Sequence, residues 1–138
     1  MRTIKFRGKR TDTKEWVYGF YNFTIYDDGS DPLMSIMRVH IIADADGYVW
    51  SIDENTVGQF TGLTDKNDKE IYEGDIVAIE YIDFDQAEDG VCHVKTVVEY
   101  ETERMRFIFS KNGKSVIKTY KSCLEVIGNI FENGDLIK

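Results

Sequence analysis

The feature that most constrains the fold is the regular succession of short apolar segments, each followed by residues that favour turns. Helical periodicity is not sustained over about ten residues anywhere in the sequence. Aromatic and β-branched residues favour strands, and the chain holds eight Tyr, eight Phe and two Trp. Eleven glycines against one proline supply turns. The sequence therefore predicts an all-β fold.

The spacing of the strands predicts two regions. After residue 74, five short strands are expected at intervals of roughly 8–12 residues, which is typical of a small barrel. The first half is expected to form a separate β meander packed on it. No Pro/Ser/Gly-rich linker lies between the halves. We therefore predict an N-terminal β region over residues 1–70 and a C-terminal barrel over residues 71–138, held as one compact unit.

Residues 56–77 join the two regions and are rich in glycine and charge. We expect residues 65–69 to form a tight turn and Gly74 to take a positive φ, which costs little without a Cβ. The start of this turn resembles a calcium loop in spacing. However, Lys69 stands where an oxygen ligand belongs, and Ile76 stands where a bidentate Glu is needed. Calcium is therefore not expected.

Alternation along the later strands predicts which side chains form the core. Val77 and Ile79 share one face of their strand, and so do Val94 and Val98. A third core face is expected from Met105, Phe107 and Phe109.

Charge is unevenly distributed along the chain. The net charge is −8. Residues 1–19 hold six bases and two acids, a net of +4, so the other residues carry −12. An acidic chain is repelled by nucleic acid as a whole, so any such contact has to be local. The residues that could make it are Arg7, Lys9 and Arg10.

An aromatic run over residues 16–26 allows three interpretations. The simplest is that its rings form a core between the two halves. The second is a protein interface, formed with a second copy or a host or phage partner, with Trp16, Tyr18, Tyr21 and Phe23 as the candidate contacts. The third is weak binding of single-stranded nucleic acid, in which these rings stack on bases beside the basic arm.

The sequence lacks the parts of a catalytic or metal site. The soft ligands are Cys92, Cys123, His40 and His93, and no Cys-x-x-Cys spacing occurs. There is no Gly-x-Ser-x-Gly turn, and nothing in the spacing supports a pair of Cys123 with His40. We predict no enzyme activity, no metal and no cofactor. No apolar run of about 18 residues is present, so no membrane span is expected, and the absence of an apolar signal segment predicts a cytoplasmic protein.

Four stretches of the chain carry a resemblance to a known family. They are RTIKFR at residues 2–7, VGQFTGLTDKN at 57–67, EIYEGDIV at 70–77 and EVIGNIFEN at 125–133. Together they resemble the YopX family and span nearly the whole chain. One departure concerns the turn, where the family tends to have Gly and this chain has Asp68. Asp tolerates a left-handed conformation better than most residues, so we expect the turn to keep its shape.

The resemblance implies a small protein encoded by a bacteriophage or prophage and acting in the cytoplasm of a bacterial host. It also implies an all-β fold whose C-terminal barrel is SH3-like, and it brings no defined catalytic residue. We therefore predict an accessory module that acts by binding, with a protein partner or a second copy as the expected ligand.

Overall fold

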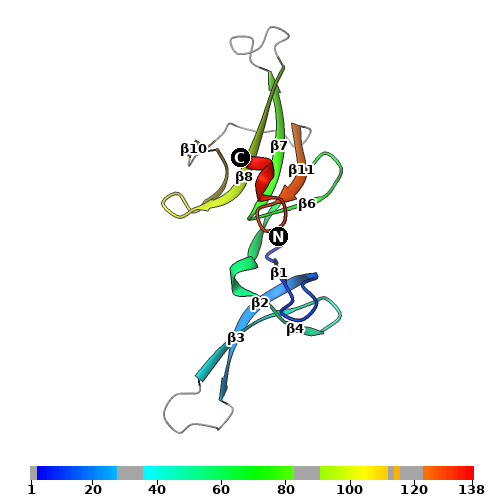
Figure 1. Ribbon diagram of the computed structural model, residues 1–138, viewed down its shortest axis with the longest axis vertical. Helices are drawn as coiled ribbons and strands as arrows, with labels where there is room; N and C mark the ends of the chain where they lie inside the picture. The colour runs from blue at the N-terminus through cyan, green and yellow to red at the C-terminus, as the bar shows by residue number, and fades with distance from the viewer. Residues whose placement is uncertain (1–2, 28–35, 83–90, 112–113, 116–122) are drawn as a thin grey trace. The chain divides into compact units, whose positions relative to one another are not determined.

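The computed structural model describes residues 3–27, 36–82, 91–111, 114–115 and 123–138. Within these residues the chain forms antiparallel sheets and no α-helix, which confirms the predicted all-β class (Figure 1). No helix of this part of the chain is long and apolar enough to cross a membrane. The chain divides into two compact units, residues 1–59 and 60–138. This division falls earlier than the boundary after residue 70 that the strand spacing suggested.

The strands of the first unit belong to a six-stranded antiparallel sheet with the order β4-β3-β2-β1-β5-β6, of which β6 (Glu70–Tyr72) falls in the second unit. The elements of the first unit are β1 (Phe6–Lys9), β2 (Trp16–Asp27), β3 (Ile36–Ala43), β4 (Val49–Ser51), the 3₁₀ turn η1 (Glu54–Thr56) and the start of β5 (Gly58–Thr64). Among its described residues, the buried apolar side chains are Ile42 and Ile52. Gly8 makes room for them, because a Cβ there would lie 2.7 Å from Cδ1 of Ile52.

Strand β2 changes partner part-way along its length. Residues 16–19 pair with β1, and residues 20–27 pair with β3. Gly19 stands at the change, where a Cβ would lie 1.9 Å from the carbonyl oxygen of Ala43. Because real Cβ atoms do not approach a backbone oxygen so closely, only glycine fits this position. Past it, β2 and β3 continue as an antiparallel strand pair, which we call the β2–β3 ribbon (residues 20–27 and 36–43; Figure 1). Strand β4 pairs with residues 41–43, so only the part of the ribbon beyond them is two-stranded.

The second unit contains a five-stranded antiparallel sheet with the order β10-β9-β8-β7-β11. The elements of this unit are the end of β5, β6 (Glu70–Tyr72), β7 (Asp75–Ile82), β8 (Val91–Glu101), β9 (Arg106–Lys111), β10 (Lys114–Ser115), β11 (Leu124–Asn129) and the 3₁₀ turn η3 (Gly134–Ile137). Over the described residues this sheet is open, with β10 and β11 at its edges. The predicted hairpin at residues 112–113 and strand at 116–120 lie outside the described residues.

The core of the second unit follows the predicted faces in part. Its buried cluster is Ile71, Val77, Ile79, Val98, Leu124 and Val126, with Val94 and Phe109 packed against it. The prediction for Met105 is wrong, because its side chain is 79% exposed. Met105 has φ +50 and lies in the turn before β9, so strand alternation does not apply to it.

The turn over residues 65–69 is closed by the backbone and by a buried carboxylate. Asp65 N–H donates to the carbonyl of Lys69 at 2.8 Å, and Asp68 N–H donates to the carbonyl of Asp65 at 3.1 Å. Asp68 takes φ +62, as its place in the turn requires. Gly74 has φ +83, which confirms the positive φ expected there.

The Asp65 carboxylate ties this turn to the last strand. Its Oδ1 accepts hydrogen bonds from the N–H groups of Asn67 at 2.8 Å and Lys69 at 3.0 Å, and its Oδ2 accepts one from Val126 at 3.0 Å. The side chain is only 1% exposed. Oδ1 therefore closes the turn itself, and Oδ2 joins the turn to β11.

Candidate functional site

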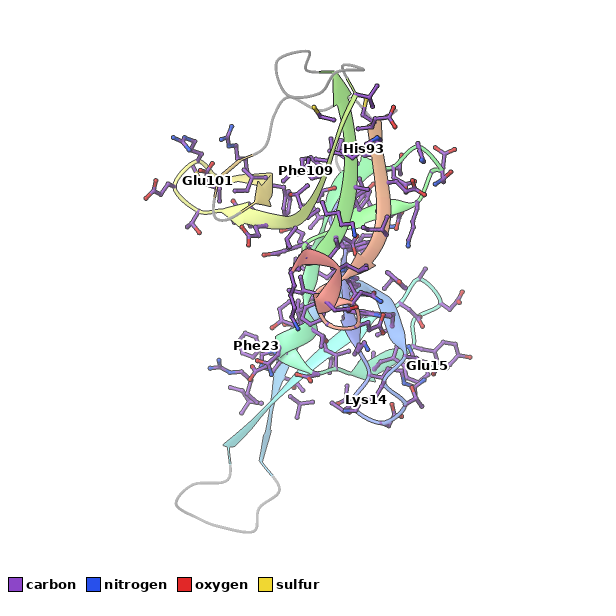
Figure 2. The ribbon with its side chains drawn as sticks, turned by 45° about the horizontal axis from the view of Figure 1, so that its top comes forward. Lys14, Glu15, Phe23, His93, Glu101 and Phe109 are labelled. Carbon is purple, nitrogen blue, oxygen red and sulfur yellow. The ribbon has the colours of Figure 1, made fainter. Side chains whose placement is uncertain are left out.

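The β2 strand displays most of its large apolar side chains to solvent. Exposed fractions are 47% for Tyr18, 70% for Phe20, 47% for Phe23 and 61% for Ile25. Figure 2 shows the Phe23 side chain at the side of the ribbon. These side chains therefore do not belong to the core of their own unit.

The four aromatic residues predicted as partner contacts divide between two faces of β2. Successive side chains of a strand point to opposite faces, so Trp16 and Tyr18 share one face while Tyr21 and Phe23 share the other. Only Tyr18 and Phe23 of the four are exposed. The structure thus does not bring the four together into one patch. Sequence reasoning missed Phe20 and Ile25 as candidate contacts, although both fall in the same uncharged run.

Two tryptophan rings of the first unit, Trp16 on β2 and Trp50 on β4, are in contact with cationic side chains. The Arg7 guanidinium lies 4.7 Å and the Lys9 ammonium 5.4 Å from the Trp16 ring centre. The Arg10 guanidinium lies 3.9 Å from the Trp50 ring centre. Cation–π contacts of this kind stabilise a fold by about 0.5–1 kcal/mol at exposed sites. These cations therefore have structural contacts of their own.

The three residues predicted to contact nucleic acid differ in their availability. Arg7 is buried, and Lys9 is half-buried. The Arg10 side chain is 19% exposed and donates two hydrogen bonds to Asp12, at 2.6 Å and 2.9 Å. The hydrogen bond from Arg10 lowers the pKa of Asp12 to about 2. Arg10 thus has a carboxylate beside it, which a phosphate would have to displace.

A hydrogen-bonded chain runs across the opposite face from Tyr21 to Glu54. The hydroxyl of Tyr21 lies 2.6 Å from Nδ1 of His40, and Nε2 of His40 lies 2.7 Å from a carboxylate oxygen of Glu54. If Nε2 carries the proton and donates to Glu54, then Nδ1 accepts from Tyr21. The chain therefore joins β2, β3 and η1, and it holds His40 in place on the ribbon.

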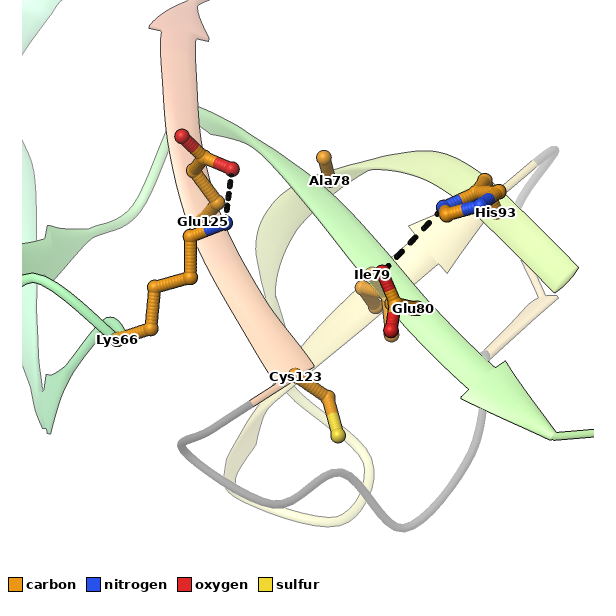
Figure 3. A pocket seen from close by; sticks show the side chains of 7 residues that line it. All are labelled: Lys66, Ala78, Ile79, Glu80, His93, Cys123 and Glu125. Carbon is orange, nitrogen blue, oxygen red and sulfur yellow. Dashed lines mark ion pairs between the residues drawn. The ribbon is translucent and has the colours of Figure 1, made fainter. Parts of the chain in front are cut away.

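A polar pocket of about 230 Å³ lies in the second unit (Figure 3). Its lining residues are Lys66, Ala78, Ile79, Glu80, His93, Cys123 and Glu125. Lys66 pairs with Glu125 at 2.5 Å, and His93 lies 3.9 Å from Glu80. In Figure 3 the His93 ring reaches toward Glu80, while the sulfur of Cys123 points away from that ring. Cys123 and His40, the pair considered from sequence, lie in different units.

Metal-ligating groups are not gathered within the described residues, where no cluster of three His, Cys, Asp or Glu side chains could hold an ion. Cys92 and Cys123 are not joined in a disulfide bond. Two other features are more distinctive. One is the set of exposed apolar side chains on the β2–β3 ribbon, and the other is the pair of tryptophan rings, Trp16 and Trp50, that contact cationic side chains. The protein thus consists of two antiparallel β units, and the ribbon is the surface with the most exposed apolar side chains.

Comparison with known proteins gives this fold a family. The chain matches the YopX protein family over residues 5–138, and it belongs to that family. A search of curated proteins finds no match. Among solved structures, the chain is similar to protein EF1440 from Enterococcus faecalis, with 24% identity, full coverage of both chains and a TM-score of 0.54. This likeness supports the fold.

Proposed function

We propose that this chain is a phage- or prophage-type accessory protein that acts by binding a protein partner through the β2–β3 ribbon. The observation that supports the proposal is the exposure of Phe20, Phe23 and Ile25 on one strand. Phe23 and Ile25 share one face of β2 and Phe20 lies on the other, so exposed apolar side chains occur on both faces of the ribbon, and exposed apolar surface of this kind is typical of protein interaction sites. Burying one such side chain contributes about 1.5–3 kcal/mol, so a few of them can drive association.

The chemistry of the ribbon favours protein over nucleic acid as the ligand. Residues 16–26 of β2 contain no charged side chain. Aromatic residues and Arg are enriched at protein interfaces, and the ribbon offers Phe23 with the Arg38 guanidinium 4.9 Å from its ring centre. Single-stranded nucleic acid binding through Arg7, Lys9 and Arg10 is the alternative, and it predicts binding that weakens steeply with salt.

The experiment compares partner retention by wild type and by a double variant, Phe20→Ser with Phe23→Ser. Bait proteins are incubated with lysate of a bacterial host, and retained proteins are quantified at low and high salt. We expect the double variant to retain at least about tenfold less of the specific partner, which corresponds to a loss of about 1.4 kcal/mol of binding free energy. Tyr48→Ser removes a ring that is also exposed in the first unit but lies outside the ribbon, and it should retain the partner.

The proposal fails if the double variant retains the partner as well as wild type does. Retention of oligonucleotide that disappears at high salt, and that persists in the double variant, would favour the alternative. Fluorescence of Trp16 and Trp50 checks that the first unit of each variant is folded, since both tryptophans lie in that unit.

We also infer that the five-stranded sheet of the second unit curls into an SH3-like barrel. Strands β7 to β10 form a meander, and β11 returns to pair with β7. This strand order supports the inference, because the sheet would close into a barrel if its two edge strands, β10 and β11, came together. An experimental structure that leaves the sheet flat would contradict it.

A further inference from the structure

The β2–β3 ribbon has an open hydrogen-bonding edge along β2. Strand β1 pairs with residues 16–19 of β2 and goes no further. Residues 20–27 pair with β3 on one side, and within the described part of the chain no strand pairs with them on the other. Such an edge presents unpaired N–H and C=O groups to any strand that can reach it.

Two hydrogen bonds show which backbone groups face this edge. Ile52 N–H donates to the carbonyl of His40 at 2.9 Å, so the backbone of His40 faces away from β2. Phe23 lies opposite His40 and therefore turns its own N–H and C=O away from β3. Consistent with this, Phe23 N–H donates to the exposed side-chain oxygen of Asn22 at 2.8 Å, a local bond that a carbonyl of a pairing strand would have to replace.

The same alternation follows from the other end of the strand. Lys9 N–H donates to Oγ1 of Thr56 at 2.8 Å rather than to its cross-strand neighbour Trp16. Even-numbered residues of β2 thus direct their backbone groups to the β3 side. Tyr21, Phe23 and Ile25 direct theirs to the open edge.

This edge lacks the usual guards against pairing. Natural edge strands carry Lys, Pro or inward-pointing charges that discourage a second strand. No charged residue and no proline lies between Glu15 and Asp27. The outer edge of β3, by contrast, carries Arg38, whose side chain is exposed.

We propose that the open edge of β2 pairs antiparallel with the same edge of a second copy of this chain. The two ribbons then form one four-stranded sheet, with the two-fold axis beside Thr24 and Phe23 of each copy opposite Ile25 of the other. A two-fold axis at Phe23 is disfavoured, because it would bring Asp27 opposite Gly19, where β1 is already paired. The inference rests on the proposed function and names the partner.

A second copy fits this edge for two reasons. An antiparallel pairing of identical strands about a two-fold axis is self-complementary, and here it sets no two like charges opposite each other. A two-stranded ribbon is also marginally stable alone in water, whereas a sheet of more strands is stable. Nucleic acid fits less well, because β2 offers the phosphates no cation along residues 16–26.

The test is the mass of the full chain in solution, measured by size exclusion with light scattering over a wide range of concentration. We expect wild type at twice the 16.0 kDa chain mass. Ile25→Pro removes an N–H that faces the open edge and leaves the β2–β3 ladder intact, since proline is tolerated at such edge positions. It should give monomers. Ile25→Thr keeps the N–H and should remain dimeric.

Amide hydrogen exchange provides the second measurement, which does not depend on a variant folding. In wild type the amides of Tyr21 and Ile25 should become protected as concentration rises. A monomer at every concentration, or a dimer that Ile25→Pro leaves intact, would overturn the inference. A monomer that still holds its partner through Phe20 and Phe23 would overturn this inference alone, and the proposed function would stand.

Discussion

Removing the Asp65 carboxylate should strongly destabilise the second unit. In Asp65→Ala, three hydrogen bonds to a charged acceptor are lost, and such bonds contribute about 1.5–3 kcal/mol each when measured singly. Asn67 and Lys69 are exposed, so water can replace the carboxylate at their N–H groups. The Val126 N–H is buried and stays unsatisfied. We therefore expect a loss of about 3–5 kcal/mol rather than the full sum.

Asp65→Asn should be milder and should also test the role of charge. Its Oδ1 can keep both bonds of the turn, but its amide NH₂ faces the N–H of Val126, and two donors repel. We expect a loss of about 2–3 kcal/mol. Chemical denaturation followed by far-UV circular dichroism measures both values. Glu99→Gln, which neutralises an exposed carboxylate on β8, is the control and should change stability by less than about 0.5 kcal/mol.

The same carboxylate should make stability depend on pH. Burial alone raises the pKa of Asp65, but the hydrogen bonds from Val126, Asn67 and Lys69, with the Lys69 charge, together lower it. A lowered folded-state pKa means that the stabilisation is complete above the ordinary value of about 3.9 and is lost as pH falls through the folded value. Wild type should therefore lose more stability in acid than Asp65→Asn does.

Two results would refute this reasoning. One is an Asp65→Ala protein whose free energy of unfolding lies within about 1 kcal/mol of wild type. The other is unchanged amide exchange at Val126 in that variant, since its N–H would then not depend on the carboxylate.

Three further predictions concern the backbone and the Tyr21–His40–Glu54 chain. Gly74→Val should lower the free energy of unfolding by more than the ~1 kcal/mol typical of point mutants, because φ is +83 and a Cβ would lie 3.0 Å from Phe131 Cε2. The control is Gly62→Val, at φ +87 with open space around it, which should lower it by less in the same denaturation assay. Gly19→Ala should disrupt the β2–β3 ladder, seen as rapid amide exchange along β3. Tyr21→Phe should destabilise the first unit by about 1 kcal/mol, measured by tryptophan fluorescence, and an unchanged midpoint would show that its hydroxyl contributes nothing.

Local sequence signals predicted the strands and turns well. The aromatic run at residues 16–26 became β2, and the Asp-rich turn and Gly74 took the expected backbone. These features depend on alternation and on φ preferences of neighbouring residues, which the sequence contains directly. The exposed face of the ribbon could not be read in the same way. Alternation shows which side chains share a face, but not whether another layer covers that face.

Asp65 shows why the rest was beyond sequence reasoning. In the sequence it is one acid in a charged turn and resembles the first ligand of a calcium loop. One of the donors to its carboxylate is Val126, which lies 61 residues away in the chain. Pairing between β7 and β11 brings that partner near, and no local pattern encodes it. A polar and charged turn sequence therefore does not show whether one of its side chains is buried.

The long separation between Asp65 and Val126 has a consequence for biosynthesis. Domains generally fold in the order in which they leave the ribosome, and the first unit, with β1 to β4 and only the start of β5, ends at residue 59. The turn at residues 65–69 is translated midway, but Oδ2 of Asp65 cannot accept its hydrogen bond from Val126 until β11, almost the last segment, has been made. The second unit thus cannot complete its fold until translation is nearly over. In a chain that ends before residue 124, the edge of β7 that pairs with β11 would have no partner strand.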